Sequence, residues 1–191
     1  MFSLPPVTQV LILINVAAYL LDSLLGDAIT AQLALWPIGS SYFAPWQLVT
    51  YAFLHGSLTH LGFNMLGVYM FGADLERVWG SKRYLQFYFA SLLAAAVAQL
   101  IVAWVTKAAY PTVGASGAVF GLLIGFAMVF PRRMVVPLIP PIPMRAPIFV
   151  AIYGAIELFL GVTGTQQGVA HFAHLGGMAG GWLMMRLWRR R

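Results

Sequence analysis

Cysteine is absent from this 191-residue chain, and charged residues make up only 8% of it. Without cysteine the chain can form neither a disulfide nor a thiolate metal site. A water-soluble domain is usually about a quarter charged, so these few charges cannot cover a surface that faces water. With 61% hydrophobic residues, the chain is expected to lie in a lipid bilayer.

Acidic residues are scarce, with 5 Asp and Glu against 11 Lys and Arg. A basic excess in an apolar chain is typical of membrane anchoring, and no basic helix or aromatic-basic stripe indicates a nucleic-acid partner. No basic residue precedes the first apolar stretch, so we expect a retained helix rather than a cleaved leader. No metal or organic cofactor is indicated.

The apolar runs predict an all-α membrane protein with one domain, residues 1–191, and six transmembrane helices. The stretch 29–46 between the first two helices is expected at the membrane surface, with Trp36, Tyr42 and Trp46 as interfacial anchors. The predicted helices span residues 7–25, 57–75, 83–105, 116–130, 146–162 and 169–187.

The basic residues divide between the two membrane sides in a way that requires an even number of crossings. All but Lys107 follow the second, fourth or sixth helix: Arg77, Lys82, Arg83, Arg132, Arg133, Arg145, Arg186, Arg189, Arg190 and Arg191. The positive-inside rule therefore predicts that both termini are cytoplasmic. A Pro-rich tract at 136–143 reads as an extended connection on that side.

The fourth predicted helix is too short to cross the bilayer. Its 15 residues, 116–130, span about 22 Å against about 30 Å of hydrocarbon. Arg132 and Arg133 fix one end at the surface, so the other end must stop inside the membrane. The preceding Pro- and Gly-containing backbone at 110–115 is tolerated there only inside protein or beside water. Ser116 stands at this helix start, as an N-cap or as a nucleophile in a wet cavity.

Polar residues on two other helices fall at a similar height. Helical rise, counted from the arginines, places Ser116 about 24 Å, His174 roughly 18–22 Å, and His60 with Asn64 roughly 20–26 Å above the basic end. Glycine stripes on the fourth and sixth helices favour close packing: Gly117, Gly121 and Gly125; Gly177 and Gly181. We expect these stripes to meet and to bring the His174 imidazole to the Ser116 hydroxyl.

His60 and Asn64 lie four residues apart and share one helix face. Both side chains can donate hydrogen bonds, so with the N–H of Ser116 they could hold a developing oxyanion. Alternatively, they form a polar clamp between helices worth about 1 kcal/mol. The residues alone leave both interpretations open.

These motifs together resemble those of the rhomboid intramembrane serine proteases of bacterial type. Residues 114–117, Gly-Ala-Ser-Gly, are similar to the family's Gly-x-Ser-Gly motif. Residues 170–177 with the glycines at 180 and 181 resemble its sixth-helix histidine motif, and 60–64 its second-helix pattern. The similarity extends over roughly residues 46–185.

The resemblance implies peptide hydrolysis by a Ser116–His174 dyad without a third acid, through an acyl-enzyme. His60, Asn64 and the N–H of Ser116 would form the oxyanion site. Its substrates would be transmembrane segments of proteins in the bacterial inner membrane, cut near small or helix-breaking residues, with entry near the second and fifth helices. The sequence fixes no oligomeric state. Four further residues are candidates for supporting the site: Gly114, Gly117, Phe120 and His171. Many relatives have Tyr at the position of Phe120, and His171 is expected to be a structural or cavity-lining group.

Gln47 and Glu157 remain to be placed, and two functions other than proteolysis remain open. Gln47 stands where many relatives have Arg, in the first loop. Glu157 is expected as a neutral, hydrogen-bonded carboxyl facing the bundle, with no partner identified. An inactive relative that binds membrane helices would be expected to lack Ser116 or His174. A small transporter would need a path of ionisable residues, of which Glu157 is one.

Overall fold

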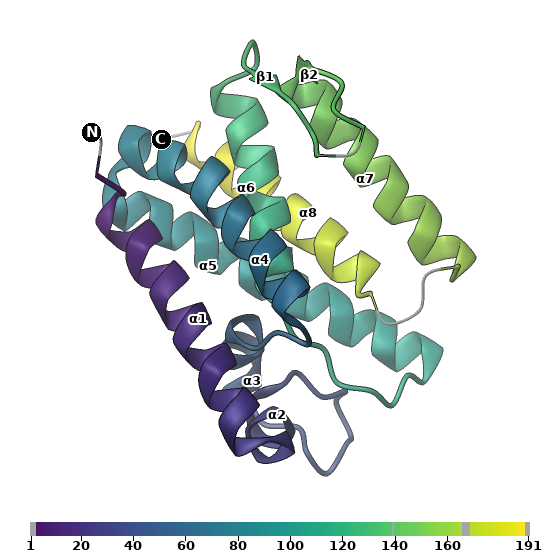
Figure 1. Ribbon diagram of the computed structural model, residues 1–191. Helices are drawn as coiled ribbons and strands as arrows, with labels where there is room; N and C mark the ends of the chain where they lie inside the picture. Colours follow the sequence, from purple (N-terminus) through teal and green to yellow (C-terminus); the bar gives the residue numbers. More distant parts are fainter. Residues whose placement is uncertain (1–2, 139, 166–168, 190–191) are drawn as a thin grey trace.

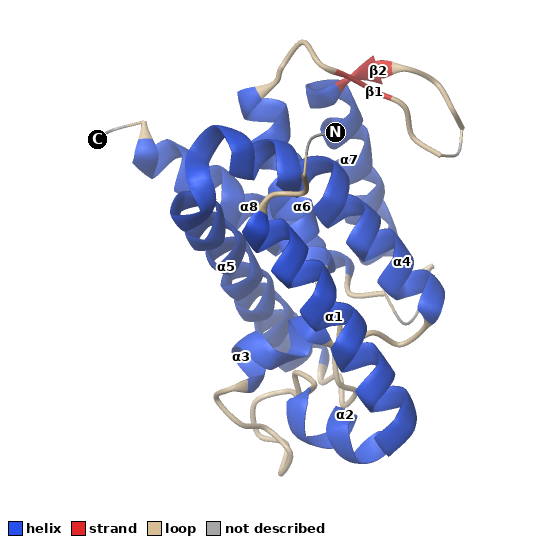
Figure 2. Ribbon diagram, turned by 60° about the vertical axis from the view of Figure 1, so that its left-hand side comes forward, coloured by secondary structure: helices blue, strands red, loops and turns tan. Residues whose placement is uncertain are grey.

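The computed structural model describes residues 3–138, 140–165 and 169–189, and most of these are helical. The long helices run roughly side by side, with a short β-hairpin at one end of the bundle and an irregular loop region at the other (Figures 1 and 2). The elements are α1 Pro6–Leu25, α2 Asp27–Leu33, α3 Gln47–Thr50, η1 Tyr51–Phe53, α4 Leu58–Gly67, η2 Val68–Gly72, α5 Ala73–Thr106, α6 Ser116–Val129, β1 Met134–Val135, β2 Met144–Arg145, α7 Ala146–Thr163 and α8 His171–Trp188.

Helix α6 lies at the centre of the bundle, in contact with α5, α7, α8 and η2. Its small residues allow this close approach on several sides. A Cβ on Gly177 of α8 would collide with the carbonyl of Gly117, and one on Gly121 would collide with the Ser91 side chain of α5. The predicted meeting of the two glycine stripes is therefore present, and it places α6 and α8 backbone against backbone.

The second predicted helix continues further than expected. Helix α4 passes into a π-helical turn at Val68–Gly72 and on into α5, without the connection expected at residues 76–82. The chain instead turns at one residue inside α5, Gly80, whose φ of 74° is accessible mainly to glycine. A single positive φ is enough to reverse direction here, so no longer connection is needed.

Glu76, just before this corner, anchors the start of α1. Its carboxylate accepts the N–H groups of Val7 at 3.0 Å and Thr8 at 2.7 Å, and the hydroxyls of Thr8 and Ser81 at 2.7 Å each. Two of these partners are first-turn amides that have no acceptor within α1. The buried carboxylate therefore ties the first helix to the second.

The loop region between α1 and η1 is held by Gln47. Its side-chain amide donates to the carbonyls of Gln32 at 3.1 Å and Tyr42 at 2.7 Å, and its oxygen accepts the N–H of Trp36 at 3.2 Å. Gln47 is fully buried, so these bonds satisfy a side chain that water does not reach. With Gln47 at this position, the loop has its own internal hydrogen bonding.

The opposite end of the bundle carries β1, β2 and most of the described basic residues. Met134 pairs with Arg145 and Val135 with Met144, so the Pro-rich tract forms the loop between two antiparallel strands. Arg133 reaches Asp74 at 2.8 Å, which joins this end to the start of α5. Ile139 of the tract, and Arg190 and Arg191 of the orientation argument, lie outside the described residues.

The outer faces of the helices are apolar. Three helical segments are long and apolar enough to cross a membrane, Pro6–Leu25, Leu58–Thr106 and Ala146–Thr163, and Ser116–Val129 is a shorter apolar helix. Large apolar side chains are exposed along α1 and α7: Leu13, Ile14, Leu20, Leu21 and Leu24; Ile148, Ile152, Ile156 and Phe159. Such a surface is stable only in lipid, and the predicted helical membrane fold is confirmed at this level.

Candidate active site

Ser116 is the first residue of α6. Backbone hydrogen bonds at Thr112 and Gly114 hold the segment that precedes it. The N–H of Gly114 donates to the Tyr51 carbonyl at 2.9 Å, and Thr112 and Leu35 exchange two bonds of 2.9 Å. Gly114 has a φ of 123°, and a Cβ there would lie 2.7 Å from the His60 ring. Only glycine fits both the conformation and the space. The N–H groups of the first turn of α6, which have no acceptor within the helix, therefore lie next to Ser116 inside the bundle.

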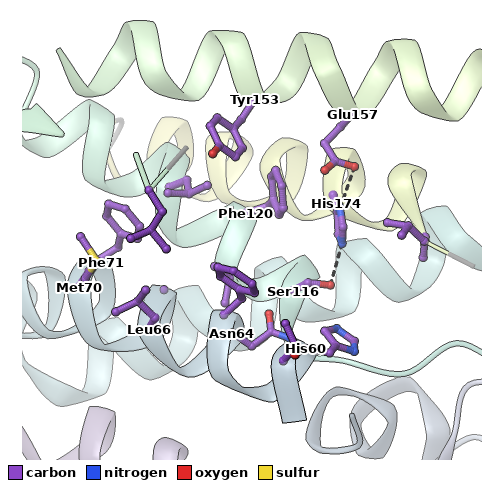
Figure 3. Close-up of a pocket in the computed structure, with 18 of the residues that line it drawn as sticks. His60, Asn64, Leu66, Met70, Phe71, Ser116, Phe120, Tyr153, Glu157 and His174 are labelled. Atoms are coloured by element: carbon purple, nitrogen blue, oxygen red, sulfur yellow. Dashed lines mark hydrogen bonds and ion pairs between the residues drawn. The ribbon is translucent and has the colours of Figure 1, made fainter. Parts of the chain in front are cut away.

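His174 of α8 faces Ser116 directly. The imidazole Nε2 and the Ser116 Oγ are 2.7 Å apart, a hydrogen-bond distance (Figure 3). His174 is 8% exposed and lies one turn before Gly177, the residue in contact with Gly117. The glycine contact therefore sets the separation of the two helices at the level of this pair.

His60 and Asn64 lie on the other side of Ser116, on α4 (Figure 3). The Ser57 hydroxyl accepts the His60 N–H at 3.1 Å and so caps the helix one turn before the site. Among the described residues, the buried Asn64 Nδ2 has no hydrogen-bond partner. An unpaired buried donor is costly, and an oxyanion formed on Ser116 would give it an acceptor.

A cavity of about 1100 Å³ opens over these residues. Ser116, His174, His60 and Asn64 all line it, together with large side chains from both sides of the space: Phe63 and Leu66 of α4, Met70 of η2, and Phe149 and Tyr153 of α7. The polar groups thus meet at one place in a largely apolar space that extends between α4 and α7 (Figure 3). The space can accept an extended peptide segment.

The family model described as the Rhomboid domain matches residues 42–191, which include Ser116, His174, His60 and Asn64. The chain belongs to the rhomboid family. Relatives from bacteria and yeast carry rhomboid names, so the predicted resemblance is confirmed, and the chain is an integral membrane protein of this family.

Three relatives indicate how far the similarity extends. The chain is 28% identical over 188 residues to "Rhomboid protease GlpG" of Serratia proteamaculans, covering 97% of this chain and 63% of that protein. It is 33% identical over 141 residues to "Putative rhomboid protease YdcA" of Bacillus subtilis, covering 73% and 65%. It is 32% identical over 137 residues to "Rhomboid protein 1, mitochondrial" of Saccharomyces cerevisiae, covering 69% and 38%. The chain thus spans less than two thirds of the length of each.

Phe120, the residue for which the resemblance leads us to expect Tyr in many relatives, packs against His174. Its ring stacks on the His174 imidazole with centroids 4.4 Å apart and planes inclined by 6°. Phe120 lies one turn after Ser116, so α6 supplies both the hydroxyl and the aromatic face that holds the imidazole. Stacking therefore restricts rotation of His174 without a phenolic hydroxyl.

Glu157 of α7 is the residue for which sequence reasoning found no partner. Its Oε2 lies 2.8 Å from His174 Nδ1 and 2.6 Å from His171 Nδ1. The ligand atoms of these three residues lie within 4.8 Å of one another. Two ligand atoms bound to one tetrahedral zinc ion would be about 3.3 Å from each other. The distances from Glu157 Oε2 to the two Nδ1 atoms are shorter and are those of hydrogen bonds. Direct hydrogen bonds therefore account for the cluster as it stands.

His55 lies outside the helices, in the loop before α4, and packs edge-on against His60 with centroids 5.0 Å apart. Burial lowers the pKa of His55 to about 4, and the nearby His60 adds to the effect. A neutral His55 therefore supports the His60 ring by packing.

Proposed function

We propose that this rhomboid is an intramembrane serine endopeptidase in which Ser116 and His174 form a catalytic dyad. The observation that carries the proposal is the 2.7 Å contact between Ser116 Oγ and His174 Nε2, at the wall of a cavity inside an integral membrane protein. A serine hydroxyl becomes an effective nucleophile when an adjacent base takes its proton.

The proposed reaction has two halves. His174 Nε2 takes the Ser116 proton while Oγ attacks a substrate carbonyl, and the resulting oxyanion accepts hydrogen bonds from Asn64, His60 and the N–H of Ser116. The protonated His174 then gives its proton to the leaving amine, and an acyl-enzyme remains. Water, deprotonated by His174, attacks the ester and releases the acid, which restores Ser116.

We propose transmembrane segments of other proteins as substrates. A membrane helix has all its carbonyls hydrogen-bonded, so it must unwind before one can reach Ser116. Small or helix-breaking residues near the cut site make this unwinding easier. The cavity between α4 and α7 supports entry from the side, because Phe63, Leu66 and Phe149 would receive apolar substrate side chains.

The topology belongs to the same proposal. We count six crossings: α1; α4 with η2 and the start of α5; α5 after Gly80; α6; α7; and α8. Helix α1 begins and α8 ends at the end of the bundle that carries β1 and β2 (Figure 1). The described basic residues other than Lys107 support a cytoplasmic position for that end, with both termini cytoplasmic in a bacterial inner membrane.

The test is labelling of the full chain in detergent by a serine-directed fluorophosphonate, together with cleavage of a model single-span substrate. Ser116→Ala should abolish both, and His174→Ala should reduce both below detection, because the two residues act as a unit. Ser91→Ala is the matched control, since its buried hydroxyl has no partner among the described residues. It should react as the wild type does.

Full activity in Ser116→Ala or His174→Ala would refute the dyad. A wild-type chain that binds single-span substrates but takes no label and cuts nothing would indicate the inactive, helix-binding alternative instead.

A further inference from the structure

Glu157 stands behind His174, on the side away from Ser116. The three groups form a line in which Oε2 contacts Nδ1 at 2.8 Å and Nε2 contacts Oγ at 2.7 Å (Figure 3). They come from three different helices, α7, α8 and α6. The Glu157 side chain is 12% exposed and that of His174 is 10% exposed, so little water competes for these bonds.

A second histidine completes the surroundings of the carboxylate. His171 Nδ1 lies 2.6 Å from the same Oε2, and the two imidazole rings meet nearly edge to face, at 85°. A carboxylate oxygen accepts two hydrogen bonds, whereas a protonated carboxyl oxygen donates only one. Two imidazole N–H groups on one oxygen fit an ionised Glu157 that accepts from both, whereas the neutral carboxyl expected from the sequence would donate to one ring and accept from the other.

An ionised Glu157 can only accept a hydrogen bond, so it selects the tautomer of His174. If Nδ1 carries the proton that Glu157 accepts, Nε2 of the neutral ring has a free lone pair directed at the Ser116 hydroxyl. That is the form a general base requires. When His174 takes the serine proton, the resulting imidazolium faces a negative charge at 2.8 Å in a poorly hydrated site, which stabilises it.

A role limited to burial would not require this geometry. A carboxylate at membrane depth must be hydrogen-bonded, and His171 already provides a short bond. The contact with His174 adds a second bond, and it reaches the ring nitrogen opposite the one that faces Ser116. Phe120 restricts the plane of the ring, while Glu157 determines which nitrogen carries the proton.

We propose that Glu157 is a positioning residue that completes a Ser116–His174–Glu157 triad, with His171 holding the carboxylate from the other side. The proposal rests on the proposed protease function and changes its mechanism from a dyad to a triad.

The experiment compares Glu157→Gln, Glu157→Asp and His171→Gln in the full chain. For each, the fluorophosphonate labelling rate, kcat and KM on a single-span substrate, and the thermal unfolding midpoint are measured in detergent. Glutamine keeps the size but loses the charge, and its NH₂ can face Nδ1 and favour the wrong tautomer. Glu157→Gln should therefore lower kcat and the labelling rate at least about 100-fold, with KM within about twofold of the wild type.

The other variants separate positioning from stability. Glu157→Asp keeps the charge and should regain most of the loss, to within about 10-fold of the wild-type kcat. His171→Gln removes a neighbour of the same buried carboxylate, so it should lower the unfolding midpoint as Glu157→Gln does. Its kcat should fall much less, because His174 keeps its own bond to Glu157.

Labelling and kcat of Glu157→Gln within twofold of the wild type would overturn the triad, and so would a loss of kcat in His171→Gln equal to that in Glu157→Gln. If Glu157→Gln does not fold, a kcat of Glu157→Asp as low as that of His174→Ala would likewise overturn it. Any of these results, with Ser116→Ala inactive and the wild type active, leaves the protease function standing. A wild type that neither reacts nor cleaves removes both proposals.

Discussion

Gly177 allows the distance between Ser116 and His174 to be changed without altering either residue. A Cβ at Gly177 would collide with the carbonyl of Gly117, the neighbour of Ser116. His174 lies one turn earlier on α8, on the face that meets α6. If α8 moves away to accommodate a methyl group, it must carry the imidazole with it.

The size of the effect follows from the hydrogen-bond distance. Relief of the collision requires a displacement on the order of 1 Å, because packed interiors contain little free space. The 2.7 Å contact between Oγ and Nε2 would then exceed hydrogen-bond length. A misplacement of about 1 Å can cost about 100-fold in rate. We therefore expect Gly177→Ala to lower labelling and cleavage about 100-fold, and the free energy of unfolding by about 1–3 kcal/mol.

Alanine substitutions at two further glycines serve as controls for Gly177→Ala. A Cβ at Gly181 would lie 3.0 Å from the Gly121 carbonyl, a milder conflict one turn further from His174, so Gly181→Ala should lose less than about 10-fold. Gly62 of α4 has no atom within 4 Å of a built Cβ, and Gly62→Ala should behave as the wild type. A Gly177→Ala protein that reacts at the wild-type rate, or an equal loss in all three variants, would refute the reasoning.

Three other substitutions test separate parts of the structure. Glu76→Ala removes the acceptor of four hydrogen bonds at the start of α1 and should lower the free energy of unfolding by about 2–4 kcal/mol. Arg77→Ala breaks only an exposed ion pair and should cost less than about 1 kcal/mol; similar thermal unfolding of the two variants would contradict the anchoring role. Asn64→Ala should lower kcat about 10²- to 10³-fold with little change in KM, if its amide stabilises the oxyanion. A raised KM with unchanged kcat would instead assign Asn64 to substrate binding.

The meeting of Ser116 with His174 was predictable because helices convert sequence spacing into height. Distances from the basic residues placed both groups at one depth, and the glycine stripes indicated which helices touch. The proposed roles of these residues, and the number of crossings, go beyond what spacing determines. Depth alone also gives no direction around a helix axis.

The contacts of Glu157 could not be predicted in this way. Helix α7 is apolar on nearly every side, so its sequence does not reveal which face meets α8. The pairing with His171 and His174 depends on that face and could not be derived. Gln47 is a second case, because its partners are backbone carbonyls whose directions follow from the path of a loop. The corner at Gly80 is a third, since a glycine permits a positive φ without requiring it.

The π-helical turn Val68–Gly72 separates two parts of one helix that serve different partners. Asn64 before the turn faces the cavity, and Glu76 beyond it faces α1. Such a turn contains one residue more than a regular one, and loss of that residue would rotate one part against the other by about 100°. The amide and the carboxylate could then no longer both reach their neighbours. The number of residues between them is therefore fixed, even where the individual side chains point into lipid and could be exchanged freely.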